Sequence, residues 1–130
     1  MADLLLVEND ARILELMSFF LRRAGHSVRT ATSFEVARAS IREKVPDLML
    51  SDLELGRESG REELPRLAGA GELPATLVVS GHVDRRTAES LAGLASVVGT
   101  LAKPFDMQRL LAKVEECLDL RARRTRGAGP

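Results

Sequence analysis

Polar side chains that could act on a charged group follow several short apolar runs of the chain. Glu8 and Asn9 come directly after one run, and Asp52 closes another. Ser80 and Lys103 follow two later runs. Carboxylate and amide oxygens are ligands suited to Mg²⁺, whereas an ammonium and a hydroxyl group suit an anionic phosphoryl group. Gathered at one place, these side chains would form a metal-assisted phosphoryl site.

Each of these residues also has an ordinary structural explanation. Asn9 or the adjacent Asp10 could cap a helix, and Asp52 could open a loop. Ser80 could belong to a turn, and Lys103 to a loop before a proline. We favour the functional interpretation because all of these positions fall at predicted strand ends, in the order that one shared site requires.

The chain lacks the motifs of several enzyme classes. Neither GxGxxG nor GxxxxGK[ST] occurs, which argues against an ordinary nucleotide-binding enzyme. A Ser–His nucleophile pair has little support, since His82 lies only two residues after Ser80. His26 follows the first helical segment, and we interpret it as a structural or solvated residue.

Composition indicates one globular domain. The 130 residues are 45% hydrophobic and 29% charged, and 19 basic residues balance 19 acidic ones. With no net charge, no Trp or Tyr and only four Phe, the chain is not expected to bind nucleic acid or a membrane surface. Cys117 is the only cysteine, which excludes an internal disulfide and a cysteine-built metal site. No membrane span or signal peptide is expected, and the expected location is cytoplasmic.

Short apolar runs alternate five times with segments of helical periodicity. Strands are expected at residues 4–7, 27–31, 47–51, 76–79 and 97–101. Helices are expected at about residues 10–24, 32–44, 59–68, 84–94 and 106–120. The remaining segments of interest are a polar loop at 52–59 and an Arg/Gly-rich tail or truncated linker at 121–130, after a domain of residues 1–120.

This alternation predicts an α/β fold with one parallel sheet and helices on both faces. The first, third and fourth strands are nearly all apolar, as strands buried on both faces must be, whereas the second alternates and suits an edge. The pattern fits a single, doubly wound, flavodoxin-like (βα)5 domain with strand order 2-1-3-4-5.

The chain resembles the receiver domain of two-component response regulators over roughly residues 2–120. Any one of the matching segments is weak evidence of the resemblance, but all four together, in this order and at these spacings, are strong evidence. The segments are Leu4–Asp10 (LLLVEND), Pro46–Leu53 (PDLMLSDL), Val78–Gly81 (VVSG) and Leu101–Phe105 (LAKPF).

The resemblance implies a signalling switch rather than an enzyme. Asp52 would accept a phosphoryl group from a histidine kinase or phosphotransfer protein, Lys103 would pair with that group, and Ser80 would bond to one of its oxygens. The domain would contribute to its own phosphotransfer and slow dephosphorylation. A downstream protein would bind the face of the fourth helix, fifth strand and fifth helix, and a homodimer is possible. The Lys103–Pro104 bond would be cis.

The resemblance also implies a bound Mg²⁺ ion. Its ligands would be Asp52, Asn9 and the backbone carbonyl of Glu54, with Glu8 acting mainly through water. Asn9 stands where the family usually has an aspartate, so the affinity for Mg²⁺ is expected to be lower than usual. The Glu54 carboxylate is expected to replace part of the missing charge.

Further departures concern switching and phosphate lifetime. Thr100 replaces the aromatic switch residue common in the family, so coupling through a turning ring cannot operate in that form. Gly56 replaces a common proline, which predicts a more flexible loop. Glu54 and His82 stand at positions that flank the path of the hydrolytic water, where they would tune how long the phosphate lasts.

Two other functions remain open at this point. Asn9 and Thr100 are also compatible with a receiver-like interaction module that no longer uses phosphate. The fold alone would allow a small flavodoxin-like enzyme or ligand binder, but that function explains none of Asp52, Ser80 and Lys103.

Overall fold

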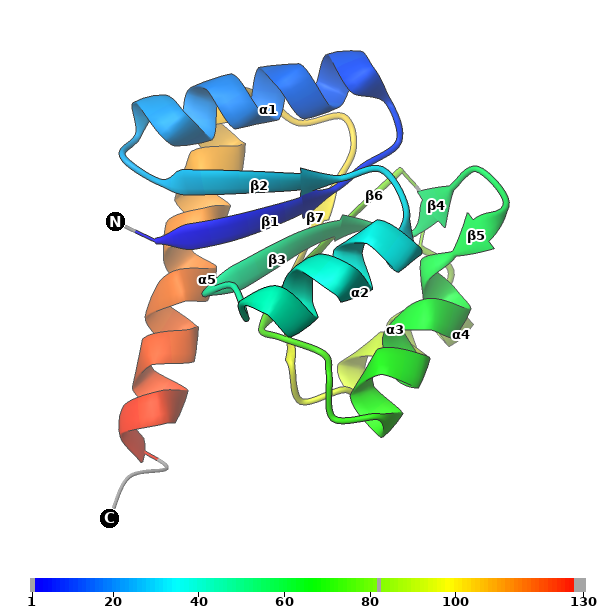
Figure 1. Cartoon of the computed structure of the whole chain (residues 1–130). Coiled ribbons are helices and arrows are strands. Elements are labelled where there is room, and N and C mark those ends of the chain that lie inside the picture. Colours follow the sequence, from blue (N-terminus) through cyan, green and yellow to red (C-terminus); the bar gives the residue numbers. More distant parts are fainter. Residues whose placement is uncertain (1, 82, 128–130) are drawn as a thin grey trace.

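A five-stranded parallel sheet forms the centre of the molecule (Figure 1). The computed structural model describes residues 2–81 and 83–127, the last three of these for the backbone only. The sheet has the order β2-β1-β3-β6-β7, which confirms the predicted flavodoxin-like topology. Its strands are β1 (Asp3–Val7), β2 (Ser27–Ala31), β3 (Leu48–Asp52), β6 (Thr76–Ser80) and β7 (Val97–Ala102). The helices are α1 (Ala11–Arg23), α2 (Phe34–Glu43), α3 (Gly60–Gly69), α4 (Arg85–Ala92) and α5 (Met107–Gly127).

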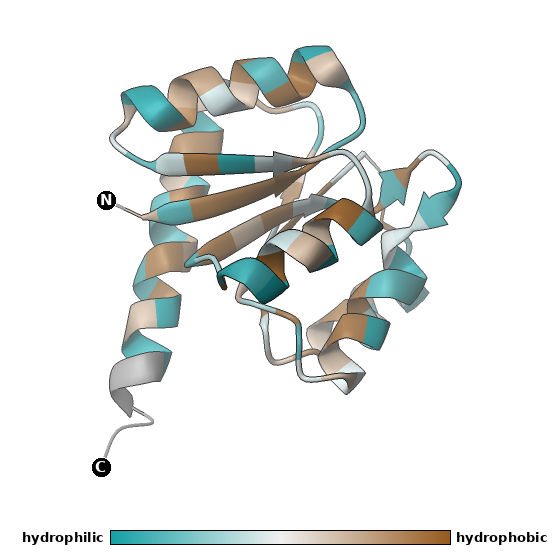
Figure 2. Cartoon of the chain, in the orientation of Figure 1, coloured by the Kyte–Doolittle hydropathy of each residue, from teal (hydrophilic) through white to brown (hydrophobic). Residues whose placement is uncertain are grey.

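Helices cover both faces of the sheet (Figures 1 and 2), and two layers of apolar side chains hold them there. Successive side chains of a strand point to opposite faces, so Leu4 and Leu6 of β1 enter one layer and Leu5 and Val7 enter the other. Helices α1 and α5 pack on the first layer, and α2, α3 and α4 pack on the second. The central strands are therefore apolar on both faces, and only their ends can carry polar side chains.

The helices begin at polar caps. Asp10 accepts the N–H groups of Arg12 and Ile13 at the start of α1, with distances of 2.9 and 3.2 Å. Helix α2 begins later than predicted, since Ser33 rather than Thr32 is its cap. The buried ring of Phe34 belongs to the core, which places the first turn of the helix at that residue.

The segment predicted as a polar loop contains a small hairpin of β4 (Glu54–Leu55) and β5 (Glu58–Ser59). Gly56 lies in its turn with a φ of 63°, a value that proline cannot adopt. Two-residue strands are too short to show a hydrophobic period, so the sequence pattern did not reveal the hairpin. The Glu58 carboxylate accepts the Phe34 N–H at 2.9 Å and joins the hairpin to α2.

Helix α5 continues past the predicted end at Leu120 as far as Gly127. The predicted boundary between domain and tail therefore falls inside a helix. Arginine is a good helix former and is favoured near a helix C-terminus, so an Arg-rich segment can extend a helix that has already formed. Arg121 pairs with Asp47 at 3.4 Å, and Arg124 donates to the carbonyl of Ala95.

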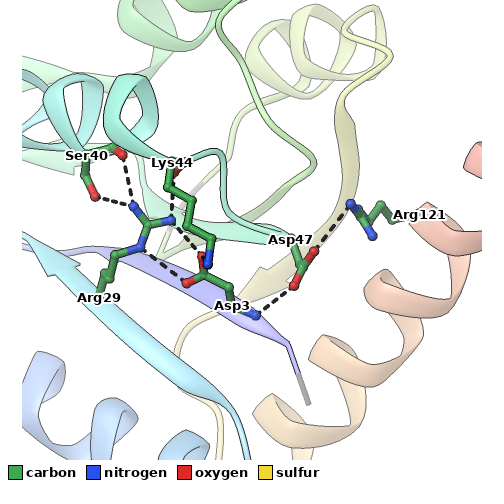
Figure 3. A network of polar contacts seen from close by, with 6 residues as sticks. All are labelled: Asp3, Arg29, Ser40, Lys44, Asp47 and Arg121. Carbon is green, nitrogen blue, oxygen red and sulfur yellow. Dashed lines mark hydrogen bonds and ion pairs between the residues drawn. The ribbon is translucent and has the colours of Figure 1, made fainter.

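A polar network lies at the edge of the sheet where the strands begin (Figure 3). Arg29 of β2 donates to both carboxylate oxygens of Asp3 at 3.3 and 3.0 Å. The same guanidinium donates to the carbonyls of Ser40 and Lys44 at the end of α2, at 2.9 and 2.8 Å. Asp47 accepts the Asp3 N–H at 2.8 Å. These contacts join β1, β2, α2 and the segment before β3.

His26 is a structural residue of the same half of the molecule. Its ring is buried, accepts the Ala2 N–H at Nδ1 and contacts the Glu115 carboxylate from Nε2, at 3.2 and 3.0 Å.

None of the helices within residues 2–81 and 83–127 has the length and apolar character that a membrane-spanning helix needs.

Candidate functional site

Two carboxylates and one ammonium group meet at the opposite edge of the sheet, where the strands end. Glu8 follows β1, Asp52 is the last residue of β3, and Lys103 follows β7. The Lys103 Nζ atom lies 2.9 Å from Asp52 Oδ2 and 3.2 Å from Glu8 Oε2. Parallel strands end at a common edge, so residues that are far apart in the sequence become neighbours here.

Both carboxylates are buried, with exposed fractions of 8% for Asp52 and 5% for Glu8. Backbone N–H groups orient the remaining oxygens: Glu54 donates to Asp52 Oδ1 and Asp10 donates to Glu8 Oε1, each at 3.1 Å. Buried charges need such partners, because water no longer solvates them. The Asp52 carboxylate is therefore held in a defined orientation beside a cation.

The electrostatics of the site follow from burial and from the shared cation. Burial raises the pKa of Glu8 above its ordinary value and the Asp52 charge adds to the shift, although the Asp10 N–H and Lys103 oppose it. Burial by itself would lower the pKa of Lys103, but the hydrogen bond and charge of Asp52, together with Glu8, raise it. With both acids ionised, one ammonium balances only one of the two carboxylates, which leaves the site attractive to a cation.

The donor set is chemically suited to Mg²⁺, although it is sparse. Asp52 and Glu8 supply carboxylate oxygens, and a carbonyl from the Glu54 segment would add a further hard donor. Asn9 is exposed beside the hairpin, where a Cβ added to Gly56 would lie 3.7 Å from its Nδ2. Within the described part of the chain, no group of three His, Cys, Asp or Glu side chains is arranged to hold a metal.

The other predicted site residues lie in different surroundings. Ser80 is buried at the end of β6, and its carbonyl accepts the Lys103 N–H at 2.9 Å, so its backbone is next to the acidic site. Thr100 is exposed on β7 and lines a groove of about 440 Å³ between α4 and β7. His82 lies outside the described residues. The predicted cis bond between Lys103 and Pro104 is confirmed.

The Glu54 side chain is engaged by a residue that sequence analysis missed. Its carboxylate forms an ion pair with Arg61 in the first turn of α3, which reduces the charge it can contribute in place of the one absent at Asn9. Arg61 also donates from Nε to Thr87 Oγ1 of α4 at 3.1 Å. Nothing in the spacing of these three residues indicates that they meet, because their contact depends on how α3 packs against α4.

Comparison with known proteins places this chain in a family. The response regulator receiver domain matches residues 4–115. The chain is 30% identical over 118 residues to the alginate biosynthesis transcriptional regulatory protein AlgB of Pseudomonas aeruginosa, covering 91% of this chain and 26% of that protein. It is 31% identical over 117 residues to the transcriptional regulatory protein ZraR of Salmonella typhimurium, covering 89% and 26%. The chain thus spans about a quarter of the length of these relatives.

Solved structures of similar proteins agree with this family match. NtrX from Brucella abortus superposes with a TM-score of 0.84 at 28% identity, over 98% of this chain and 29% of that one. A CheY-like receiver domain protein from Methanospirillum hungatei has a TM-score of 0.83 at 24% identity over 93% and 96% of the two chains, a likeness of fold. The paired acids, the lysine and the sheet order all agree with this assignment, and the chain belongs to the response regulator receiver domain family.

Proposed function

We propose that this receiver domain is a switch that accepts a phosphoryl group on Asp52 from a histidine kinase or a phosphotransfer protein. The observation that carries the proposal is the environment of Asp52, which is the last residue of a central strand and whose carboxylate is oriented by Lys103 and the Glu54 N–H. A carboxylate held in this way is already oriented when a phosphoryl donor arrives.

In the proposed transfer, an Asp52 oxygen forms a bond to phosphorus as the phosphorus–nitrogen bond of a phosphohistidine breaks. The electron pair of that bond returns to the imidazole of the donor. Lys103 moves its ammonium from the carboxylates toward a phosphoryl oxygen and balances its charge. The Ser80 hydroxyl donates to a second phosphoryl oxygen, which draws the segment between β6 and α4 toward the site. Asp52, Asn9 and the Glu54 carbonyl would hold Mg²⁺, with Glu8 acting mainly through water, and the ion would supply further charge neutralisation.

The consequence of phosphorylation is proposed to appear on the face of α4, β7 and α5. The segment after Ser80 leads directly into α4, so movement at the hydroxyl reaches that helix through the backbone. Relatives such as AlgB and ZraR are named as transcriptional regulatory proteins and are about four times as long as the matched segment. We propose that this face regulates a downstream protein or domain in a similar way.

The proposal is tested by incubating the protein with a small phosphodonor and Mg²⁺ and measuring its intact mass. We expect a gain of one phosphoryl group that is absent in Asp52→Asn. The matched control is Asp47→Asn, directly before the first residue of the same strand, which should keep the gain. No gain from either a small donor or a phosphorylated kinase would instead favour the phosphate-independent interaction module.

A further inference from the structure

The guanidinium of Arg61 joins the segment next to Asp52 to helix α4. One of its nitrogens, Nη1, pairs with the Glu54 carboxylate of β4, and Nε donates to Thr87 Oγ1 at 3.1 Å. The Glu54 N–H donates in turn to Asp52 Oδ1. A continuous series of polar contacts therefore runs from the proposed acceptor, through the hairpin and the first turn of α3, to α4.

The base of this series is tightly packed. The Gly60 N–H donates to the Leu53 carbonyl at 2.6 Å, and a Cβ on Gly60 would lie only 2.9 Å from Leu53 Cα and 3.2 Å from the Asp52 carbonyl oxygen. The Arg61 N–H is held by Ser59 Oγ at 3.3 Å. Because no space separates the start of α3 from the chain at Asp52, a displacement of that chain must be transmitted to Arg61.

The other end of the series holds the beginning of α4. Thr87 is buried with an exposed fraction of 7%, and its N–H donates at 2.7 Å to Asp84, the cap of this helix. Helix α4 spans only Arg85–Ala92, so one hydrogen bond at its first turn is a large part of what fixes that end. The bond from Arg61 is thus placed where it can restrain the whole helix.

We propose that Arg61 is a positioning residue that restrains α4 in the unphosphorylated domain and releases it when Asp52 is phosphorylated. This inference rests on the proposed phosphorylation of Asp52. A phosphoryl group on Asp52 adds negative charge next to the Glu54 backbone, and it takes up the oxygen that accepts the Glu54 N–H in the unphosphorylated domain. The guanidinium is drawn toward the new charge and away from Thr87. This series of contacts thereby couples Asp52 to α4, in place of the aromatic switch residue that Thr100 replaces.

The test compares amide hydrogen exchange in α4 of the full chain before and after phosphorylation, with the phosphorylated fraction measured by intact mass. In the wild type we expect the amides of the first turn of α4 to exchange about five- to tenfold faster after phosphorylation, as loss of one net hydrogen bond implies. Thr87→Val removes the acceptor and keeps the shape. Arg61→Lys keeps the charge, but its single ammonium cannot contact Glu54 and Thr87 in the fixed geometry of a guanidinium.

In both variants the first turn of α4 should exchange rapidly in both states, so that phosphorylation adds less than twofold. The double variant should behave like either single variant, because both remove the same contact. The matched control is Arg66→Lys on the same helix, since Arg66 is exposed and pairs with Glu63 within α3. That control should respond as the wild type does.

The outcomes separate this inference from the proposed function. A wild type that gains no phosphoryl mass overturns both. A wild type that gains the mass, with variants that show the same five- to tenfold response, overturns only the role of Arg61. Equal phosphorylation of wild type and Arg61→Lys with loss of the exchange response supports it, because a purely structural residue would alter the exchange of α4 without removing its dependence on phosphate.

Discussion

The two edges of the sheet use the same kinds of charged group in opposite ways. At the edge where the strands begin, Arg29 makes contacts with Asp3 and with two carbonyls at the end of α2, and Asp3 has Lys44 as a second cation at 3.7 Å. At the edge where the strands end, Glu8 and Asp52 share the single ammonium of Lys103.

The difference in pairing corresponds to a difference in role. The Arg29 network neutralises its carboxylate and ties elements together, so it has little to gain from a further ion. The Lys103 site pairs two buried carboxylates with one ammonium group, and burial, together with the nearby Asp52 charge, raises the pKa of Glu8. Incomplete charge pairing lowers the stability of the fold but leaves the site able to bind a cation and an anionic group. This combination is a common feature of functional sites.

The largest expected effect comes from removing the shared cation. Lys103→Met should slow phosphoryl uptake by about 100-fold or more, because the developing charge on the phosphoryl group loses its nearest positive partner. The rate of mass gain with a small phosphodonor measures this effect. Lys113→Met, which removes an exposed pair with Glu116 on α5, is the matched control. A rate for Lys103→Met within a few-fold of the wild type would contradict the assigned role.

Removing the cation at the other edge should affect stability and leave phosphoryl uptake unchanged. Arg29→Met leaves Asp3 and the last carbonyls of α2 poorly paired, and we expect a loss of about 2–3 kcal/mol in the free energy of unfolding. Urea denaturation followed by circular dichroism measures this loss. Arg85→Met breaks an exposed pair with Glu89 and should cost less than about 0.5 kcal/mol. Equal effects of the two substitutions would show that the network does not stabilise the fold.

Adding charge at the functional edge should sharpen the contrast. Asn9→Asp introduces a further carboxylate next to the proposed metal site. We expect the affinity for Mg²⁺ to rise about tenfold, because the added negative charge attracts the ion although solvent screens it in part. Isothermal titration calorimetry measures the affinity. Asp10→Asn, at the exposed helix cap, should change it less than twofold. An unchanged affinity for Asn9→Asp would mean that residue 9 does not reach the metal.

The smallest expected effect concerns Glu8 and pH. Because the pKa of Glu8 is raised in the fold, the folded protein binds a proton more readily than the unfolded chain, and stability falls as pH rises from the ordinary value of 4.5 through the raised pKa. Glu8→Gln removes this dependence. In metal-free buffer, the free energy of unfolding of the variant should therefore rise relative to that of the wild type across this pH range, by about 1 kcal/mol or less. A difference between the two proteins that stays constant with pH would contradict this expectation.

Much of the fold could be predicted because burial leaves a simple pattern. Strands covered on both faces must be nearly all apolar, and an edge strand alternates, so the sheet order followed from runs such as Leu4–Val7 and Ser27–Ala31. The hairpin at Glu54–Ser59 and the extension of α5 to Gly127 escaped prediction. The strands of the hairpin are too short to show a hydrophobic period. The extension of α5 depends on the helix that precedes it and on contacts with distant loops.

The candidate site divides in the same way. The residue types and their positions after apolar runs were sufficient to select Glu8, Asp52 and Lys103, since the ends of parallel strands converge whatever the detail of the packing. The contacts of Arg61 could not be predicted, because they require α3 and α4 to be placed side by side. Sequence reasoning treated the Glu54 carboxylate as available, whereas packing supplied it with a partner.

By itself, the sequence determined which chemical groups the chain can bring to one edge of a sheet and in what order. Only the tertiary structure decided how those groups share their charges. Residues 8, 52 and 103 are separated by long stretches of chain, and the register of four neighbouring strands sets the 2.9 and 3.2 Å distances that make one lysine serve two acids. Burial then gives this arrangement its strength, because a charge withdrawn from water responds to its nearest neighbours.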